Sequence, residues 1–236
     1  MKKLIPLMMC LVLSVMVFAQ TGVDFQHLTF DEALAKAKAE KKLVFVDCYT
    51  TWCGPCKMMT TKIFPMKEAG EFFNPRFVCV KFDMEQGEGK ELKNKLGVRA
   101  YPSFFIIRPD GTVQHAVVGG DELEPFIERV KKGLNEKTSL LYLNQQYEKG
   151  KMNKKQLLAY KVALDDAYDQ KKAEQVKKET KKLEDVVTQI TDYIKNNKSD
   201  MDKIKPIIAK TKELGYENPT TISKVEDAEI VLELIS

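Results

Sequence analysis

The stretch LVFVDCYTTWCGPCKMM, residues 43–59, joins a continuous apolar run to two cysteines spaced three apart, Cys53 and Cys56. An apolar run of this length without polar alternation is typical of a central parallel strand that is buried on both faces. We expect a helix to begin in or just after the cysteine pair and to continue to Pro65. The stretch therefore predicts a strand that leads into a helix, with both thiols near the helix N-terminus.

The residues around this stretch alternate between helix and strand patterns. Helical segments are amphipathic, and strand segments are apolar runs bounded by turn residues. The order β-α-β-α-β-β-α, preceded by one helix, predicts an α/β domain at residues 25–135, a mixed sheet with helices on both faces. Besides the central strand and its helix, we predict helices at residues 29–42, 90–98 and 122–134, a strand at residues 76–82 and a pair of strands within residues 102–120.

The second half of the chain has a different composition. All twelve phenylalanines, the tryptophan, all four arginines and both histidines lie at or before Arg129, and the rest is rich in lysine. Apolar residues there recur at spacings of three and four, which predicts an all-α domain at residues 136–236, an antiparallel array of four to six helices with breaks at 197–200 and 213–219. These helices either form a core of their own or offer a surface to a protein partner. The periodic positions are Leu157, Tyr160, Leu164, Tyr168, Ala173, Val176, Thr180, Leu183, Val187, Ile190 and Ile194.

The N-terminus has the pattern of a secretory signal peptide. Two lysines precede an uncharged apolar run, residues 4–18, which is short for a bilayer span, and the small residue Ala19 follows it. We expect residues 1–19 to be removed, with Cys10 among them, and the mature protein to be exported. An uncleaved membrane anchor is the alternative.

Charge and ligand types argue against several functions. The formal net charge is only +4, and basic and acidic residues nearly balance in both halves, so there is no electrostatic footprint for nucleic acid. A structural zinc site needs four ligands, usually a second CxxC or a histidine pair, but His27 and His115 stand alone. We therefore expect no metal and no cofactor.

Four cysteines remain after residue 19, and they are not arranged as a disulfide scaffold. Cys48 and Cys79 lie inside apolar runs, where cysteine behaves as a small buried side chain. A regulatory second disulfide is the minor alternative for these two. The closely spaced pair, Cys53 and Cys56, is left as the candidate for chemistry.

The placement of this pair favours redox chemistry. At a helix N-terminus, unpaired N–H groups and the positive end of the helix dipole favour the thiolate of Cys53, which is the nucleophile. Cys56, one turn later, is expected to be more buried and to keep its proton longer. Cys53 would attack a substrate disulfide, and Cys56 would resolve the mixed disulfide.

At this point the residues resemble the thioredoxin family. The motif WCGPCK at residues 52–57 matches the active-site motif of that family. Further matches lie on both sides of it, in the order that the family has, over residues 30–134. They are LVFVD at residues 43–47, VKFD at residues 80–83, VRAYPS at residues 98–103 and VGG at residues 118–120. The resemblance implies a thioredoxin-like fold and a redox-active Cys53–Cys56 disulfide.

The resemblance also implies roles for residues around the pair. Asp47 becomes a buried carboxylate that takes the proton of Cys56, and Lys81 tunes the proton affinity of Asp47. Pro102 becomes a cis-proline, which leaves the Tyr101 backbone free to pair with an extended substrate segment. The remaining residues implied in substrate binding are Trp52, which covers the site, Gly54 and Pro55 between the cysteines, and Gly119 near the groove.

Two departures from the family pattern change the expectations. The helix-kinking proline five residues after the second cysteine is replaced by Thr61, which predicts a straighter helix. The residue before the cis-proline is usually small or β-branched, and Tyr101 is neither, so we expect a reshaped groove.

The sequence thus predicts an exported thiol:disulfide oxidoreductase. Gly-Pro between the cysteines resembles reducing members of the family, so reduction or isomerisation of periplasmic protein disulfides is favoured. The expected partners are protein thiols and disulfides as substrates, a membrane or periplasmic electron donor, and a protein partner for the helical half. A non-catalytic scaffold, with one half for docking and the other for recruitment, is the rival.

Overall fold

The apolar run that opens the sequence motif forms one of the two interior strands of a four-stranded sheet. The computed structural model describes residues 22–150 and 152–235; the predicted signal peptide lies outside them. Strand β1 (Leu43–Tyr49) pairs in parallel with β2 (Phe77–Asp83) and antiparallel with β3 (Ser103–Ile107), which pairs antiparallel with β4 (Val113–Val118). The sheet order is β2-β1-β3-β4, which confirms the predicted mixed sheet.

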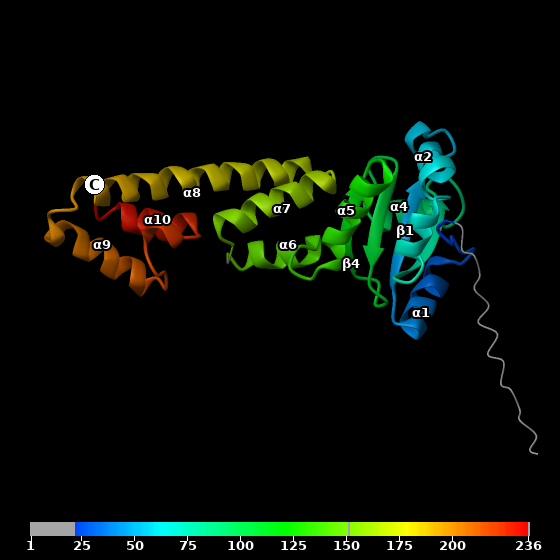
Figure 1. Cartoon of the computed structure of the whole chain (residues 1–236), viewed down its shortest axis with the longest axis horizontal. Coiled ribbons are helices and arrows are strands. Elements are labelled where there is room, and N and C mark those ends of the chain that lie inside the picture. Colours follow the sequence, from blue (N-terminus) through cyan, green and yellow to red (C-terminus); the bar gives the residue numbers. More distant parts are fainter. Residues whose placement is uncertain (1–21, 151, 236) are drawn as a thin grey trace, which may run out of the picture.

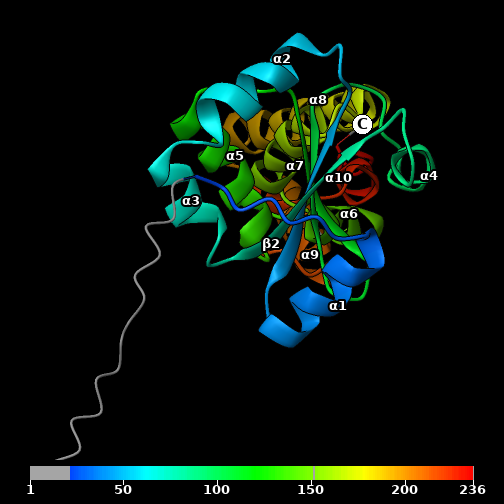
Figure 2. The same cartoon turned by 90° about the vertical axis from the view of Figure 1, so that its right-hand side faces the viewer.

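Helices cover both faces of this sheet (Figures 1 and 2). One face carries a core rich in phenylalanine, with Phe45 of β1 in contact with Phe73, Phe77 and Phe104. The other face carries a separate and mostly aliphatic core, called the aliphatic core below. On the first face lie α2 (Gly54–Met58), the π-helix η1 (Met59–Ile63), α3 (Lys67–Phe73) and α5 (Leu123–Leu134), and on the second lie α1 (Phe30–Glu40) and α4 (Gly89–Lys95).

The helix after the cysteine pair differs from the predicted one. It continues from α2 into the π-helix η1, where the Phe64 N–H donates to the Met59 carbonyl at 2.8 Å. The hydroxyl of Thr61 donates to the Lys57 carbonyl at 2.7 Å. Loss of the family proline therefore does not give an uninterrupted α-helix, because a π-turn occupies this position.

Helix α3 was not predicted, and Gly70 explains why. A glycine in the middle of a seven-residue segment weakens any helical signal. The structure requires it, because a Cβ at residue 70 would lie 2.2 Å from the Gly22 carbonyl oxygen. A tertiary contact thus determines a residue that local propensity disfavours.

The C-terminal half is helical and has its own core. The predicted breaks at residues 197–200 and 213–219 are present, and of the periodic positions Leu157, Tyr160 and Ile190 are among those that lie in this core. Tyr168 does not, since it lies beyond the end of its helix with φ 59° and is 48% exposed. None of the described helices is long and apolar enough to cross a membrane. The helical C-terminal region consists of α6 (Leu140–Glu148), α7 (Lys154–Asp166), α8 (Gln170–Asn196), α9 (Met201–Glu213), the 3₁₀ turn η2 (Pro219–Thr221) and α10 (Val225–Leu232).

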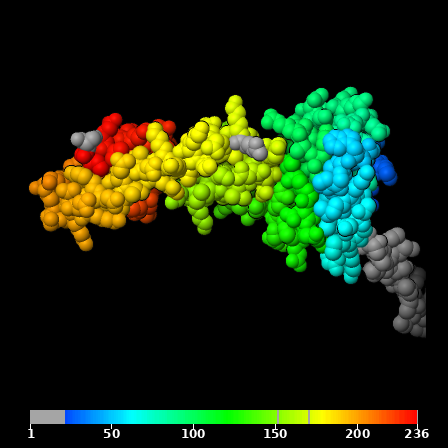
Figure 3. Space-filling view, turned by 90° about the horizontal axis from the view of Figure 1, so that it is seen from above, coloured from blue at the N-terminus to red at the C-terminus, as the bar shows by residue number. Residues whose placement is uncertain are grey.

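The helical C-terminal region packs on the β4 side of the sheet and extends away from it, which makes the molecule elongated (Figures 1 and 3). Leu140 and Ala167 contact the aliphatic core of the α/β part. The N–H of Leu140, in the first turn of α6, donates to Nδ1 of the buried His115 at 3.1 Å. The two halves therefore share a packed and hydrogen-bonded junction.

Candidate active site

Cys53 and Cys56 form a disulfide at the N-terminus of α2. Their sulfurs are 1.99 Å apart and their Cα atoms 5.3 Å apart. Cys53 is the N-cap residue, and its sulfur accepts a hydrogen bond from the Cys56 N–H at 3.1 Å. The two residues are 3% and 4% exposed, so in this oxidised form they are equally buried.

This placement suits thiol–disulfide exchange. The Cys56 N–H points at the Cys53 sulfur and, after reduction, would stabilise a thiolate there. The residues between the cysteines, Gly54 and Pro55, are exposed at the start of α2, and a Cβ at residue 54 would meet no described atom within 4 Å. The chain between the two cysteines is therefore open to solvent.

Asp47 is buried in β1 on the sheet face that α2 covers. Its side chain alternates with those of Val46 and Cys48, which face the aliphatic core on the other side. Its Oδ1 accepts no hydrogen bond from the described part of the chain. Burial raises the pKa of Asp47 to about 7, and the charge of Lys81, its register partner on β2, partly offsets that rise. The carboxyl group can therefore gain or lose a proton near neutral pH.

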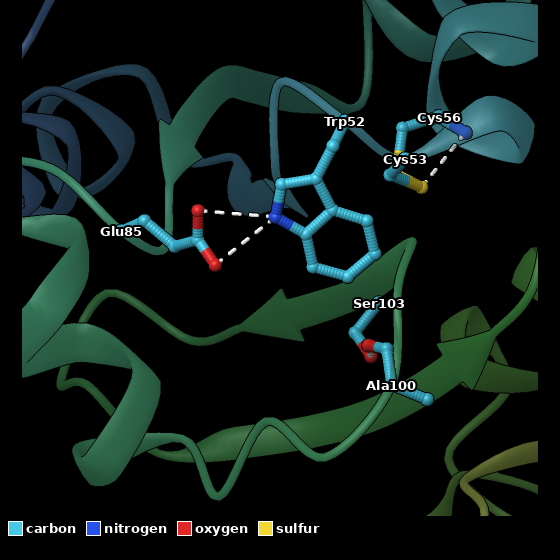
Figure 4. The surroundings of a disulfide bond; sticks show 6 residues. All are labelled: Trp52, Cys53, Cys56, Glu85, Ala100 and Ser103. Atoms are coloured by element: carbon cyan, nitrogen blue, oxygen red, sulfur yellow. Dashed lines mark hydrogen bonds between the residues drawn. A yellow bond between two sulfur atoms is a disulfide. The ribbon is translucent and has the colours of Figure 1, made fainter.

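Trp52 is held in place at the rim of the site by a residue that sequence reasoning missed (Figure 4). Its indole N–H donates to both carboxylate oxygens of Glu85 at 3.1 Å, while its side chain is 64% exposed. The ring of Tyr101 packs edge-on against the indole, with centroids 5.8 Å apart. Glu85 is 33 residues from Trp52 and lies in an exposed turn, so no local signal distinguishes it.

The segment beside the disulfide contains a cis peptide bond between Tyr101 and Pro102, as the resemblance implies. The N–H of Gly119 donates to the Pro102 carbonyl at 2.8 Å, and Gly119 has φ 88°, which favours glycine. The Tyr101 hydroxyl is buried and has no hydrogen-bond partner among the described residues. Trp52, Tyr101, Pro102 and Gly119 thus belong to one neighbourhood of backbone and aromatic surface.

The other cysteines and histidines do not join this site. Cys48 and Cys79 are buried free thiols in cores on opposite sheet faces, and burial raises the pKa of each. They do not form a second disulfide with one another. His115 lies at the junction with α6. Within the described ranges, no three histidine, cysteine or acidic side chains gather as a group that could hold a metal ion.

Comparison with known proteins identifies relatives of the α/β part. The family model described as Thioredoxin matches residues 22–132. Thioredoxin F, chloroplastic, of Oryza sativa subsp. japonica is 41% identical over 39% of this chain and 48% of its own, so this chain spans about half of that relative. Thioredoxin Asp f 28 of Aspergillus fumigatus is 31% identical over 40% of this chain and 84% of its own. The solution structure of a candidate disulphide-isomerase from Bacteroides thetaiotaomicron is 44% identical, with a TM-score of 0.46, over 49% of this chain and 95% of that one.

Proposed function

The chain belongs to the thioredoxin family, and from this premise we propose that it is a thiol:disulfide oxidoreductase that reduces or isomerises protein disulfides. The observation that carries the proposal is the Cys53–Cys56 disulfide at the start of α2, beside Trp52 and the Tyr101–Pro102 segment. The two sulfurs of a reversible dithiol are within bonding distance. In this proposal a substrate approaches them along the exposed neighbours Trp52, Gly54 and Pro55.

The reaction is a two-step exchange that starts from the reduced pair. The Cys53 thiolate attacks one sulfur of a substrate disulfide, which breaks that bond, forms a mixed disulfide and releases one substrate thiolate that takes up a proton. Cys56 gives its proton to the Asp47 carboxylate and attacks the Cys53 sulfur. This step forms the Cys53–Cys56 disulfide and releases the second substrate thiol. Two electrons have then passed from the protein to the substrate.

Residues around the disulfide supply the substrate surface in this proposal. An extended substrate segment pairs with the backbone of Tyr101 and lies against Pro102 and Gly119. Trp52 covers the segment from the opposite side, fixed by Glu85. The bulk of Tyr101, packed against Trp52, narrows the space beside the disulfide relative to a family member with a small residue there.

The setting of the reaction is part of the same proposal. We place the enzyme in the periplasm, exported by residues 1–19, where a membrane or periplasmic dithiol reductant returns the Cys53–Cys56 pair to its reduced form. Residues 25–135 act as the catalytic domain and residues 136–236 as a helical domain with a protein partner.

The test of this function is reduction of insulin disulfides with dithiothreitol as the electron source. Cys53→Ser should lose this activity, because the nucleophile is gone, whereas Cys48→Ala should keep it. Full activity of Cys53→Ser would reject the proposed function. An oxidised pair that dithiothreitol does not reduce would instead support the scaffold hypothesis.

The order of the two steps is tested by trapping. Cys56→Ala should accumulate mixed disulfides between Cys53 and substrate proteins, because the resolving thiol is missing. Mass spectrometry of the trapped species should place the bond on Cys53. A bond on Cys48 or Cys79 would contradict the assignment.

A further inference from the structure

One arginine connects the helical C-terminal region to the backbone at the end of β4. Arg129 of α5 donates from Nη2 to the Val118 carbonyl at 2.6 Å and from Nη1 to the Gly119 carbonyl at 3.4 Å. Gly119 in turn donates its N–H to the Pro102 carbonyl. The guanidinium group therefore holds the end of β4, where it meets the segment beside the disulfide.

The third nitrogen of this guanidinium group, Nε, points to the helical C-terminal region. Arg129 Nε donates to Oδ1 of Asp166, the last residue of α7, at 3.0 Å. The second oxygen of Asp166 accepts from Lys132 at 3.0 Å. The side chains of Arg129 and Asp166 are only 18% and 17% exposed, so solvent screens this pair less than a surface ion pair. Figure 1 shows the end of α7 beside α5.

The geometry gives Arg129 and Asp166 different roles. A planar guanidinium group that donates from all three of its nitrogens is held in one orientation, and the carboxylate that binds Nε helps to fix that orientation. Without Asp166, Arg129 would keep its attraction to the two carbonyls but lose the contact that orients its fork. The position of the Gly119 backbone then depends on a residue that lies outside the thioredoxin-like part.

We propose that Asp166 is a positioning residue for protein substrates: through Arg129 it fixes the Gly119 backbone beside Pro102. The inference rests on the proposed function, since it concerns how that same groove is held. It assigns the helical C-terminal region a part in binding protein disulfides, whereas small disulfides, which need only the Cys53 sulfur, are reduced without it.

The experiment compares Asp166→Ala with Asp165→Ala. Asp165 is the adjacent carboxylate on α7 and pairs only within that helix, with Lys161, among the interactions described. Pre-reduced protein is mixed with insulin or with hydroxyethyl disulfide, and formation of the Cys53–Cys56 disulfide is followed by acid quenching and alkylation. The concentration dependence gives a half-saturating concentration and a maximal rate for each substrate.

We expect Asp166→Ala to raise the half-saturating insulin concentration about fivefold or more, the lower range of measured couplings between sites. Its maximal rate, its reaction with hydroxyethyl disulfide and the redox potential of the pair should match those of Asp165→Ala. Equal insulin binding by the two variants, or an equal loss on both substrates, would overturn the proposal. Inactivity of the unmodified protein on both substrates would instead reject the proposed function.

A second variant covers the case in which Asp166→Ala folds poorly. Arg129→Lys keeps the positive charge beside Asp166 but has no fork to reach both carbonyls. It should raise the half-saturating insulin concentration in the same way, whereas Lys132→Met, which removes the other partner of Asp166, should not. Insulin binding by Arg129→Lys equal to that of Lys132→Met would also overturn the proposal.

Discussion

At the scale of single residues, the buried carboxyl group of Asp47 is the feature with the clearest chemical consequence. Its pKa of about 7 means that it is half ionised near neutral pH. In the proposed mechanism only the ionised form can accept the proton of Cys56, so we expect the resolving step to quicken as the pH rises through about 7.

Asp47→Asn should therefore slow resolution of the mixed disulfide by about 100-fold above neutral pH, the lower end of general acid–base effects. The mixed disulfide on Cys53 should accumulate in a single turnover, as measured by acid quenching and mass spectrometry. The inflection near neutral pH should also disappear.

Lys81→Met should shift the pH dependence of resolution, whereas Asp47→Asn should abolish it. The charge of Lys81 lowers the pKa of Asp47, so its removal should raise that pKa further and move the inflection to higher pH, with the same maximal rate. Resolution by Asp47→Asn at the unmodified rate, with the inflection retained, would show that Asp47 is not the proton acceptor.

Some residues of the site could be predicted from the sequence, and others could not. The cysteine pair lies in a local motif, and Asp47 was predicted from the end of an apolar strand together with the family resemblance. Glu85 and Asp166 do not, because their partners, Trp52 and Arg129, are 33 and 37 residues away, and exposed or half-buried acidic residues are common in any chain. Only the tertiary structure brings these pairs together.

At the scale of elements, the packing of α5 against β4 depends on a glycine. A Cβ at Gly133 would lie 2.6 Å from both the His115 Cβ and the Ile106 Cδ1. The His115 Cβ sits next to the backbone and cannot move without the strand. The buried Gln114 reinforces this contact, since its amide donates to the Gly133 carbonyl at 2.7 Å.

We expect Gly133→Ala to lower the free energy of unfolding by about 1–2 kcal/mol, because overpacking exceeds the gain in helix propensity. Urea unfolding measures this change. Lys131→Ala, an exposed substitution on the same helix, should stay within about 0.5 kcal/mol of the unmodified protein. Unchanged or increased stability of Gly133→Ala would contradict the close contact.

Elements were predictable where one local pattern dominated. The alternating order of the α/β part and the breaks of the helical region follow from apolar periodicity and turn residues. Helix α3 was missed because Gly70 is required by a tertiary contact with Gly22, which apolar periodicity does not reveal. The π-turn of η1, where the Thr61 hydroxyl bonds to the main chain, has no signal in that periodicity either. The docking of α6 on His115 had no sequence signal either.

At the scale of the whole molecule, two buried groups give opposite pH dependences of stability. The pKa of Asp47 is raised from 3.8 to about 7, so its contribution to stability falls as the pH rises between these values. Burial lowers the pKa of His115 from 6.5 to about 4, although Asp166 opposes the shift, so its contribution is lost as the pH falls from 6.5. Between about pH 4 and 6.5 the two contributions change with pH in opposite directions, so the resulting slopes of stability against pH nearly cancel.

Single substitutions should expose each slope. Relative to the unmodified protein, Asp47→Asn should gain stability with rising pH in this range, and His115→Gln should lose it, each by about 1 kcal/mol per pH unit. Urea unfolding of the oxidised proteins measures both, and the double variant Asp47→Asn/His115→Gln should return to the unmodified slope. Parallel pH profiles for the two single variants would contradict the assignment.

The buried Asp47 and His115 also determine what unfolding does to the surrounding buffer. Between about pH 4 and 6.5 the folded chain keeps a neutral carboxyl group and a neutral imidazole, and the unfolded chain has both groups charged. Unfolding therefore amounts to the relocation of one hydrogen ion from Asp47 to His115 within the same polypeptide. Through this pair, the protein neither acidifies nor alkalises an unbuffered solution when it unfolds.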